Sequence, residues 1–143
     1  GIRDLVRSRG LGDVYKRQAF LGTCCNARLE DLKIAADIVN GKKIAPGVRF
    51  QITPASQLVY LQAVKEGIVE TLIDAGGYVT NSNCGPCLGA HMGVPAKDEK
   101  VISTANRNFK GRMGNRDSFV YLASPATVAA SALKGEIADF REL

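Results

Sequence analysis

Four cysteines in the 143-residue chain occur as an adjacent pair, Cys24 and Cys25, and as a CxxC pair, Cys84 and Cys87, within NCGPCLGAH. This is not the spread of a secreted disulfide framework, and no stretch of the sequence has the pattern of an export signal. We therefore expect metal or redox chemistry in a reducing, cytoplasmic compartment. Three kinds of site fit the residues: a thiol–disulfide centre, a zinc site and part of an iron–sulfur site.

The redox interpretation needs a low-pKa cysteine at a helix N-terminus, which Pro86 could begin. Pro125 lies roughly where a thioredoxin-type centre has its cis-proline, but Asn83 replaces the usual Trp and Cys24 is left without a task. A zinc site could use Cys24, Cys84, Cys87 and His91. Zinc ligands normally form two compact chelating pairs, however, and a lone cysteine far upstream does not fit that pattern.

An iron–sulfur cubane is normally held by four thiolates. If Cys24, Cys84 and Cys87 bind three irons, the fourth iron stays open and can bind a hydroxyl or carboxylate as a Lewis acid. Adjacent residues of an extended segment point to opposite sides, so Cys24 and Cys25 should not reach the same cluster. We expect Cys25 to be a small buried apolar residue.

The segment NRNFKGR places Arg107 and Arg112 five positions apart. This spacing would splay the two side chains on a helix, so they converge only in a loop, which Gly111 permits. Arginine forks bind carboxylates bidentately, and two forks beside a metal predict a compact di- or tricarboxylate ligand. Taken alone, a solvated basic loop is the simpler interpretation; the nearby cysteines favour the carboxylate site.

Strand-like and helix-like segments alternate from residue 21 onward, which predicts an α/β layered sheet. We expect helix caps at Asn26, Ser56 and Ser124, the last followed by Pro125 at the first helical position. Short strands lead into the loops that carry Cys24, Cys84 and Asn106, and ligands gather at the carboxyl ends of parallel strands. The expected strands are 48–53, 78–79, 100–105 and 119–123, and the expected helices are 27–41, 56–67, 69–77 and 126–134.

The net charge of +5 is concentrated in residues 1–18, which hold five basic and two acidic residues. This segment is weakly patterned and resembles a translated sequencing-adapter tail, so we set it aside and take residues 19–143 as the domain. Aromatic residues are 6% of the chain and Trp is absent, which disfavours stacking on nucleic-acid bases. No apolar run approaches the ~18 residues of a membrane span. We therefore expect neither a nucleic-acid nor a membrane partner.

Four blocks of sequence together resemble the aconitase superfamily, and within it the isopropylmalate dehydratase branch shared with homoaconitase. The resemblance implies a layered α/β/α sandwich and makes the chain the C-terminal part of an aconitase-type iron–sulfur domain of a large subunit. Two positions differ from the common pattern: Cys25 stands where Thr is frequent, and Ala27 where Gly or Ser is frequent. The blocks are LGTCCNARLEDL (21–32), NCGPCLGAHMGV (83–94), ISTANRNFKGRMG (102–114) and VYLASPATVAASALKGEI (120–137).

The resemblance also implies roles for individual residues. Cys24, Cys84 and Cys87 would hold a [4Fe–4S] cluster. Arg107 and Arg112 would bind substrate carboxylates, with Asn106 lining the site. No catalytic role follows for His91, for which we expect local packing or hydrogen bonding.

The implied reaction is the reversible removal and re-addition of water on a hydroxy acid. In this family the base is a serine on a separate domain or small subunit, and no residue here matches it. We therefore expect a small-subunit partner and no turnover by this chain alone. The sequence leaves open isopropylmalate, homocitrate-type and citrate-type substrates.

Overall fold

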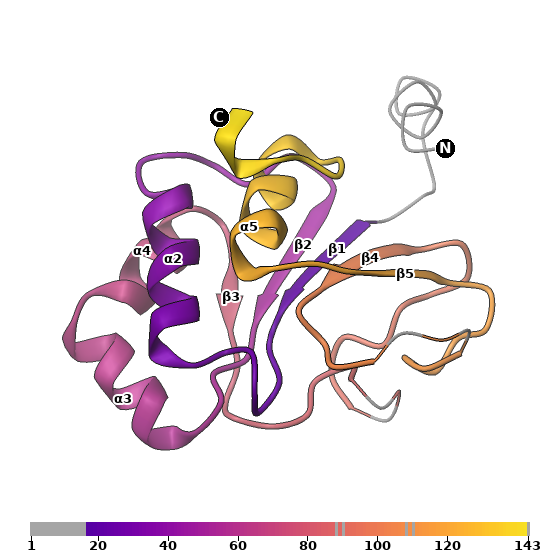
Figure 1. Ribbon diagram of the computed structural model, residues 1–143, viewed down its shortest axis with the longest axis horizontal. Coiled ribbons are helices and arrows are strands. Elements are labelled where there is room, and N and C mark those ends of the chain that lie inside the picture. Colours follow the sequence, from indigo (N-terminus) through magenta and orange to yellow (C-terminus); the bar gives the residue numbers. More distant parts are fainter. Residues whose placement is uncertain (1–16, 88, 90, 108, 110, 143) are drawn as a thin grey trace.

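The computed structural model describes residues 17–87, 89, 91–107, 109 and 111–142. In this part of the chain, five parallel strands form one sheet in the order β3-β2-β1-β4-β5 (Figure 1). A parallel sheet carries all its strand carboxyl ends at one edge. The strands are β1 Arg17–Leu21, β2 Val48–Ile52, β3 Tyr78–Val79, β4 Lys100–Ser103 and β5 Phe119–Leu122.

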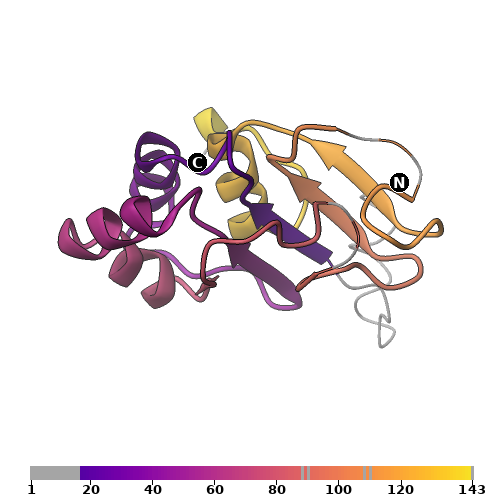
Figure 2. The same ribbon diagram turned by 90° about the horizontal axis from the view of Figure 1, so that it is seen from below.

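The helices pack on one face of the sheet, where α2 contacts both α5 and α4 (Figures 1 and 2). The predicted α/β class is confirmed, but a second helical layer is absent among the described residues. The described residues of segments 80–99 and 104–118 run over the other face as turns and coil. The helices are α2 Leu29–Val39, α3 Gln57–Lys65, α4 Ile68–Asp74 and α5 Pro125–Lys134, followed by the 3₁₀ turn η2 Phe140–Glu142.

Crossover handedness explains this distribution. The chain runs from β1 through β2 to β3 in one direction across the sheet, and right-handed crossovers put α2, α3 and α4 on one face. The chain then runs the opposite way, from β3 to β4 and on to β5. The same handedness sends these two connections, which carry the CGPC and arginine motifs, over the opposite face.

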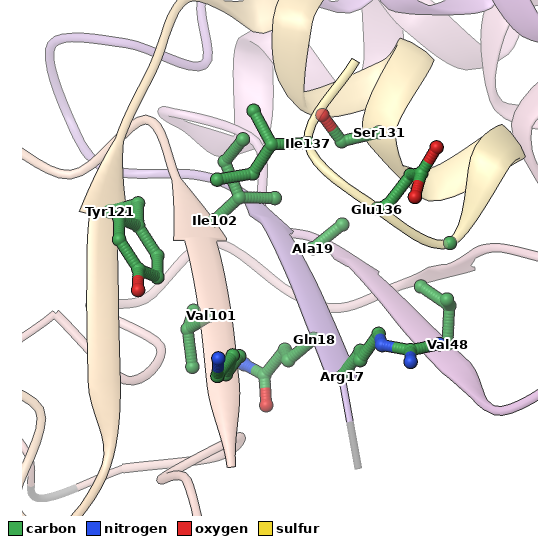
Figure 3. A pocket seen from close by; sticks show the side chains of 12 residues that line it. Arg17, Gln18, Ala19, Val48, Val101, Ile102, Tyr121, Ser131, Glu136 and Ile137 are labelled. Atoms are coloured by element: carbon green, nitrogen blue, oxygen red, sulfur yellow. The ribbon is translucent and has the colours of Figure 1, made fainter. Parts of the chain in front are cut away.

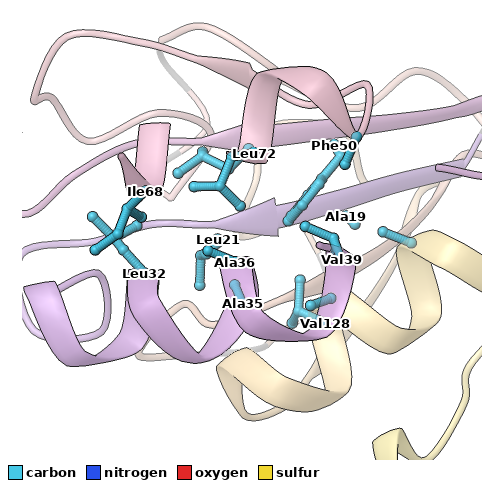
Figure 4. Close-up of a cluster of buried hydrophobic side chains, with 14 of the residues drawn as sticks. Ala19, Leu21, Leu32, Ala35, Ala36, Val39, Phe50, Ile68, Leu72 and Val128 are labelled. Carbon is cyan, nitrogen blue, oxygen red and sulfur yellow. The ribbon is translucent and has the colours of Figure 1, made fainter. Parts of the chain in front are cut away.

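The main hydrophobic core lies between the sheet and the helices (Figure 4). Alternate residues of β1, Ala19 and Leu21, point into it, as do Phe50 and Ile52 of β2. The buried residues of α2 form one apolar stripe, as expected for a helix packed on a sheet; they are Leu32, Ala35, Ala36 and Val39.

The opposite face of the sheet is partly apolar and partly polar. Phe20 and Val101 pack with Ala105 and Met113, and the half-buried Cys87 contacts this cluster. Towards β2 and β3, the buried Gln51 side chain accepts a hydrogen bond from the Tyr78 hydroxyl at 2.8 Å. This face is therefore closed by its own loops.

An ion pair fastens the loop that follows the CGPC motif to the sheet. Arg49 of β2 pairs with the Glu99 carboxylate, whose side chain is 1% exposed. Arg49 also donates to Gln18 Oε1 at 2.7 Å, and Glu99 accepts from the backbone amide of Ala96 at 2.7 Å. Because Glu99 directly precedes β4, the pair sets where this long connection rejoins the sheet.

Two of the three predicted helix caps are confirmed. The Ser56 and Ser124 hydroxyls accept from the amides of Val59 and Thr127, each at 3.2 Å, and Pro125 is the first residue of α5. The prediction for Asn26 is wrong, because α2 begins two residues later, with Arg28 at its N-cap.

The segment set aside at the start of the chain lies outside the described residues except for Arg17 and Gln18. These two residues belong to β1, so the boundary expected between 18 and 19 falls within a strand. No helix in the described part of the chain has the length and apolar character needed to cross a membrane.

Candidate metal and carboxylate site

A threonine follows each of the first four strands, and these residues join the loops at the carboxyl edge. Thr104, after β4, donates to the carbonyl of Gly22 at 2.9 Å and accepts from the Gly22 amide at 3.0 Å. The hydroxyls of Thr53 and Thr80, after β2 and β3, lie 2.7 Å apart. These threonines are not among the predicted site residues, although each of these strand ends carries one, in LGT, QIT, YVT and IST.

The Cys24 loop is a tight turn directly after β1. Thr23 has a φ of +88°, which is rare for a β-branched residue and strains the backbone by on the order of 1–3 kcal/mol. Its hydroxyl accepts from the Asn26 amide at 3.2 Å. The Asn26 side chain donates to the Thr104 carbonyl at 2.7 Å and to Asn106 Oδ1 at 2.9 Å. Asn26 thus links the Cys24 loop to the arginine loop instead of capping α2.

The CGPC segment forms a turn that rests on β1. The Cys87 amide donates to the Cys84 carbonyl at 3.1 Å, and Asn83 Oδ1 accepts from the Gly85 amide at 2.5 Å. Gly85 has a φ of +54°, and a Cβ there would lie 2.8 Å from Cζ of Phe20. Only glycine permits this approach. Phe20 therefore brings the CGPC turn onto the strand that leads to Cys24.

Arg112 lies beside one of these thiols. Its Nη2 is 3.8 Å from Sγ of Cys87, and its guanidinium stacks 5.7 Å from the centre of the Phe109 ring. Its buried Nε has no hydrogen-bond partner among the described residues. Arg107 and Asn106 are exposed, with Asn106 bound to Asn26. The structure thus joins Arg112 to Cys87, and Asn106 to the Cys24 loop.

The expected burial of Cys25 and its expected orientation away from Cys24 are wrong. Cys25 is exposed, and its sulfur lies 3.7 Å from that of Cys24. The reason is local geometry: residues 24–26 form a turn, so the alternation of an extended strand does not apply. His91 is also exposed, which contradicts the packing expected for it.

The donor set argues against a single metal ion. Among the described residues, no group of three Cys, His, Asp or Glu side chains could hold one, which removes the support for zinc on Cys24, Cys84, Cys87 and His91. A cubane separates its thiolates more widely than one ion does, and all four thiols are free. The described residues thus place these free thiols on loops at one edge of the sheet, and one of them lies beside an arginine.

The thioredoxin-type interpretation also loses support. The described residues of the CGPC segment form turns and bends, not the start of a helix, so the helix N-terminus that would activate a thiol is missing there. No peptide bond in the described chain is cis, so Pro125 is trans and occupies the first position of α5.

The best-defined cavity does not belong to this site. It has a volume of about 40 Å³ and is lined by the first residues of β1, β2 and β4 and by the end of α5 (Figure 3). In a parallel sheet these strand starts lie at the edge opposite Cys24 and the arginine loop. The cavity lining is also mostly apolar, including Ala19, Ile102 and Ile137.

Comparison with known proteins decides the family. A sequence model of the Aconitase family (aconitate hydratase) matches residues 7–135. The chain belongs to the aconitase family. The match begins within the first 18 residues that the sequence analysis set aside. It includes all four cysteines and both arginines of the candidate site.

Several curated relatives from this family are more than half identical to the chain. The 3-isopropylmalate dehydratase large subunit of a Hydrogenobaculum species is 58% identical over 126 residues, and large subunit 2 from Archaeoglobus fulgidus is 56% identical over 125. The Clostridium beijerinckii large subunit is 55% identical over 128 residues. These matches cover 87–90% of this chain but only 30% of each relative. The aconitase-family chain thus spans less than a third of their length.

Proposed function

We propose that this chain is the C-terminal part of the iron–sulfur domain of a hydro-lyase large subunit. Cys24, Cys84 and Cys87 would hold a [4Fe–4S] cluster, and Arg107 and Arg112 would bind the carboxylates of a hydroxy acid, with Asn106 lining the site. The observation that carries the proposal is the contact of Arg112 with Cys87, on a turn seated against Phe20 of β1. This contact places the Arg112 guanidinium, which can bind a carboxylate, beside the Cys87 thiol, a candidate cluster ligand.

When bound, the cluster would supply Lewis-acid chemistry for the departure of a hydroxyl. The residues of this chain would bind and orient the substrate. Arg112 is suited to this task because Phe109 stacks on its guanidinium while its buried Nε has no partner among the described residues. A carboxylate on that fork gains charge-assisted hydrogen bonds and a fixed orientation. Asn26 holds Asn106 towards the Cys24 loop and so shapes the same edge.

The relatives' names support 3-isopropylmalate as the substrate and a separate small subunit as the partner. Homoaconitate or aconitate hydration is the alternative within the family. The proton-abstracting base would come from the partner. A reducing cytoplasmic compartment agrees with four free cysteines.

The edge strand β5 supports the idea that further polypeptide covers this domain. Phe119, Tyr121 and Leu122 are each 38–48% exposed, and Phe109 is 56% exposed beside them. A hollow of about 410 Å³ lies among Phe109, Phe119 and Tyr121. Exposed apolar patches of this kind mark interaction surfaces. We propose that the part of a large subunit that this chain lacks occupies it, so the chain alone should show no dehydratase turnover.

The carboxylate role can be tested on the reduced, anaerobically reconstituted chain. Addition of 3-isopropylmalate should change the electron paramagnetic resonance spectrum of the cluster. Arg112→Lys, which keeps the charge but loses the fork, should weaken this response at least tenfold, whereas Arg141→Lys, at a distant exposed ion pair, should not. A response that Arg112→Lys leaves unchanged would contradict the proposed role.

Anaerobic reconstitution of the chain also distinguishes the cluster from the redox and zinc interpretations. A colourless chain with a reversible Cys84–Cys87 disulfide would favour a thiol oxidoreductase. A colourless chain with one bound zinc would favour a zinc-stabilised binding module.

A further inference from the structure

The proposed cluster site leaves one thiol unused. Cys25 is exposed, and its sulfur lies 3.7 Å from the sulfur of Cys24, which is exposed as well. The two thiols therefore face the same side of the turn and are open to a ligand from solution.

The turn that carries these thiols is held from both sides. The Asn26 amide donates to the Thr23 hydroxyl at 3.2 Å, and the Asn26 side chain donates to the Thr104 carbonyl at 2.7 Å. Thr23 itself is fixed at a φ of +88°. The thiol pair is thus positioned by the fold before any ligand binds, which lowers the entropic cost of binding.

Cys24 and Cys25 are poorly placed to form a disulfide with each other. Adjacent Cα atoms across a trans peptide are about 3.8 Å apart, below the ~4.4–6.8 Å usual for a disulfide. A Cys24–Cys25 disulfide would be strained and easily reduced, so both thiols stay available. Zinc is also disfavoured, since it takes four ligands and no third Cys, His, Asp or Glu completes a metal group in the described chain.

We propose that Cys24 and Cys25 form a bidentate site for a soft, three-coordinate thiophilic centre, with trivalent arsenic compounds as the ligand class. Soft thiolates select such centres. With phenylarsine oxide, two S–H bonds and the As–O bond break, two As–S bonds form, and the oxygen leaves as water. Arsenic stays trivalent throughout. Its carbon substituent fills the third position, so two sulfurs complete the site.

An arsenical bound to Cys24 and Cys25 would compete with assembly of the cluster, because both need the Cys24 thiol. This competition rests on the proposed function, whereas arsenical binding itself does not. The chain would then be open to thiophilic poisons in its cluster-free state and protected once the cluster is in place. A serine or threonine at position 25 would remove the second sulfur and with it the chelate.

The test uses the reduced, cluster-free chain and phenylarsine oxide, followed by native mass spectrometry. Cys84 and Cys87 are a second dithiol, so binding is measured with both changed to serine. This double variant should bind one equivalent. Adding Cys25→Ser should lower the affinity at least a hundredfold, and 2,3-dimercaptopropanol should strip the ligand. The proposed site would be overturned if the double variant bound no phenylarsine oxide, or if it bound the compound equally well with and without Cys25.

A second measurement addresses competition. With one equivalent of the arsenical bound, iron uptake on reconstitution should fall in the wild-type chain, and peptide mass spectrometry should find the ligand on Cys24 and Cys25. Cys25→Ser shows how much iron uptake the Cys84–Cys87 dithiol blocks when it binds the arsenical alone. Thermal melts of both chains check that folding is unchanged. Arsenical binding without loss of iron uptake would leave the thiol site standing and count against Cys24 as a cluster ligand.

Discussion

The side-chain amide of Asn26 donates to Oδ1 of Asn106 at 2.9 Å, across 80 residues of sequence. The same amide donates to the carbonyl of Thr104 at 2.7 Å. Asn26 follows the cysteine pair after β1, and Asn106 opens the arginine loop after β4. The Asn26 side chain therefore links the loop that carries Cys24 to the loop that carries the carboxylate-binding arginines.

Asn26→Ala should lower the free energy of unfolding by about 1–3 kcal/mol, because it removes two hydrogen bonds and leaves the Thr104 carbonyl without that donor. It should also slow cluster reconstitution by loosening the Cys24 loop. Urea denaturation measures the first effect, and iron uptake the second. Gln57→Ala, at the exposed start of α3, is the control and should change neither. An Asn26→Ala chain as stable as the control would contradict the linking role.

The hydroxyl pair between Thr53 and Thr80 predicts a non-additive double-mutant cycle. The two oxygens lie 2.7 Å apart and both residues are buried. Each single Thr→Val change should cost about 1–2 kcal/mol, since it leaves one polar partner buried. The double variant should cost less than the sum of the two single changes, because the bond between the hydroxyls is lost only once. The contacts of Thr53 with Gln51 Nε2 (3.5 Å) and of Thr80 with the Asn81 carbonyl (3.1 Å) contribute additively. Chemical denaturation gives the four stabilities, and strict additivity would rule out the interaction.

Gly85 and Gly47 form a matched pair for testing how the CGPC turn sits on β1. Both have positive φ, +54° and +80°, but a Cβ at Gly47 meets nothing within 4 Å, while one at Gly85 meets the Phe20 ring. Gly47→Ala should cost about 1–2 kcal/mol from backbone strain alone. Gly85→Ala should cost more and also reduce cluster binding. Phe20→Leu should recover part of the cluster binding lost in Gly85→Ala, and equal costs at the two glycines would contradict the close packing.

Burial raises the pKa of Tyr78 above its ordinary value of 10.0, with Glu99 acting in the same direction and Arg49 opposing it. Above pH 10 the unfolded chain loses this proton while the folded chain keeps it. The contribution of Tyr78 to stability is therefore present below pH 10 and is lost as the pH rises towards the folded pKa. Tyr78→Phe should flatten this part of the stability profile, and ultraviolet titration should lose one tyrosine step above pH 10. A Tyr60→Phe chain should keep both features.

The helices and strands β2 to β5 followed from the sequence because apolar periodicity, Ser caps and Gly or Pro breaks are local signals. The extent of β1 did not, since this strand begins at Arg17, inside the segment set aside. α2, α3, α5 and β2 all lie within or at the predicted ranges. The carboxyl-edge clustering of motifs also followed, since it needs only a parallel sheet. What periodicity could not supply was the face on which each connection runs, which depends on strand order.

Local conformations were predicted least well. An extended segment predicts that Cys25 is buried, whereas a turn after the strained Thr23 brings both sulfurs together. Asn26 was taken for a cap because its type fits one, but its partner is 80 residues away. The contact of Gly85 with Phe20 likewise depends on tertiary packing. Such long-range pairs leave no mark in a single sequence.

The central claim is that Cys24, Cys84 and Cys87 hold a [4Fe–4S] cluster, with Cys25 outside it. Anaerobic reconstitution with iron and sulfide, followed by Mössbauer spectroscopy and iron analysis of each Cys→Ser variant, tests it most directly. The wild-type and Cys25→Ser chains should take up iron and sulfide in equal amounts and give the spectrum of a cubane, while the other three variants should lose it. A cubane that survives Cys24→Ser, or one that requires Cys25, would contradict the account.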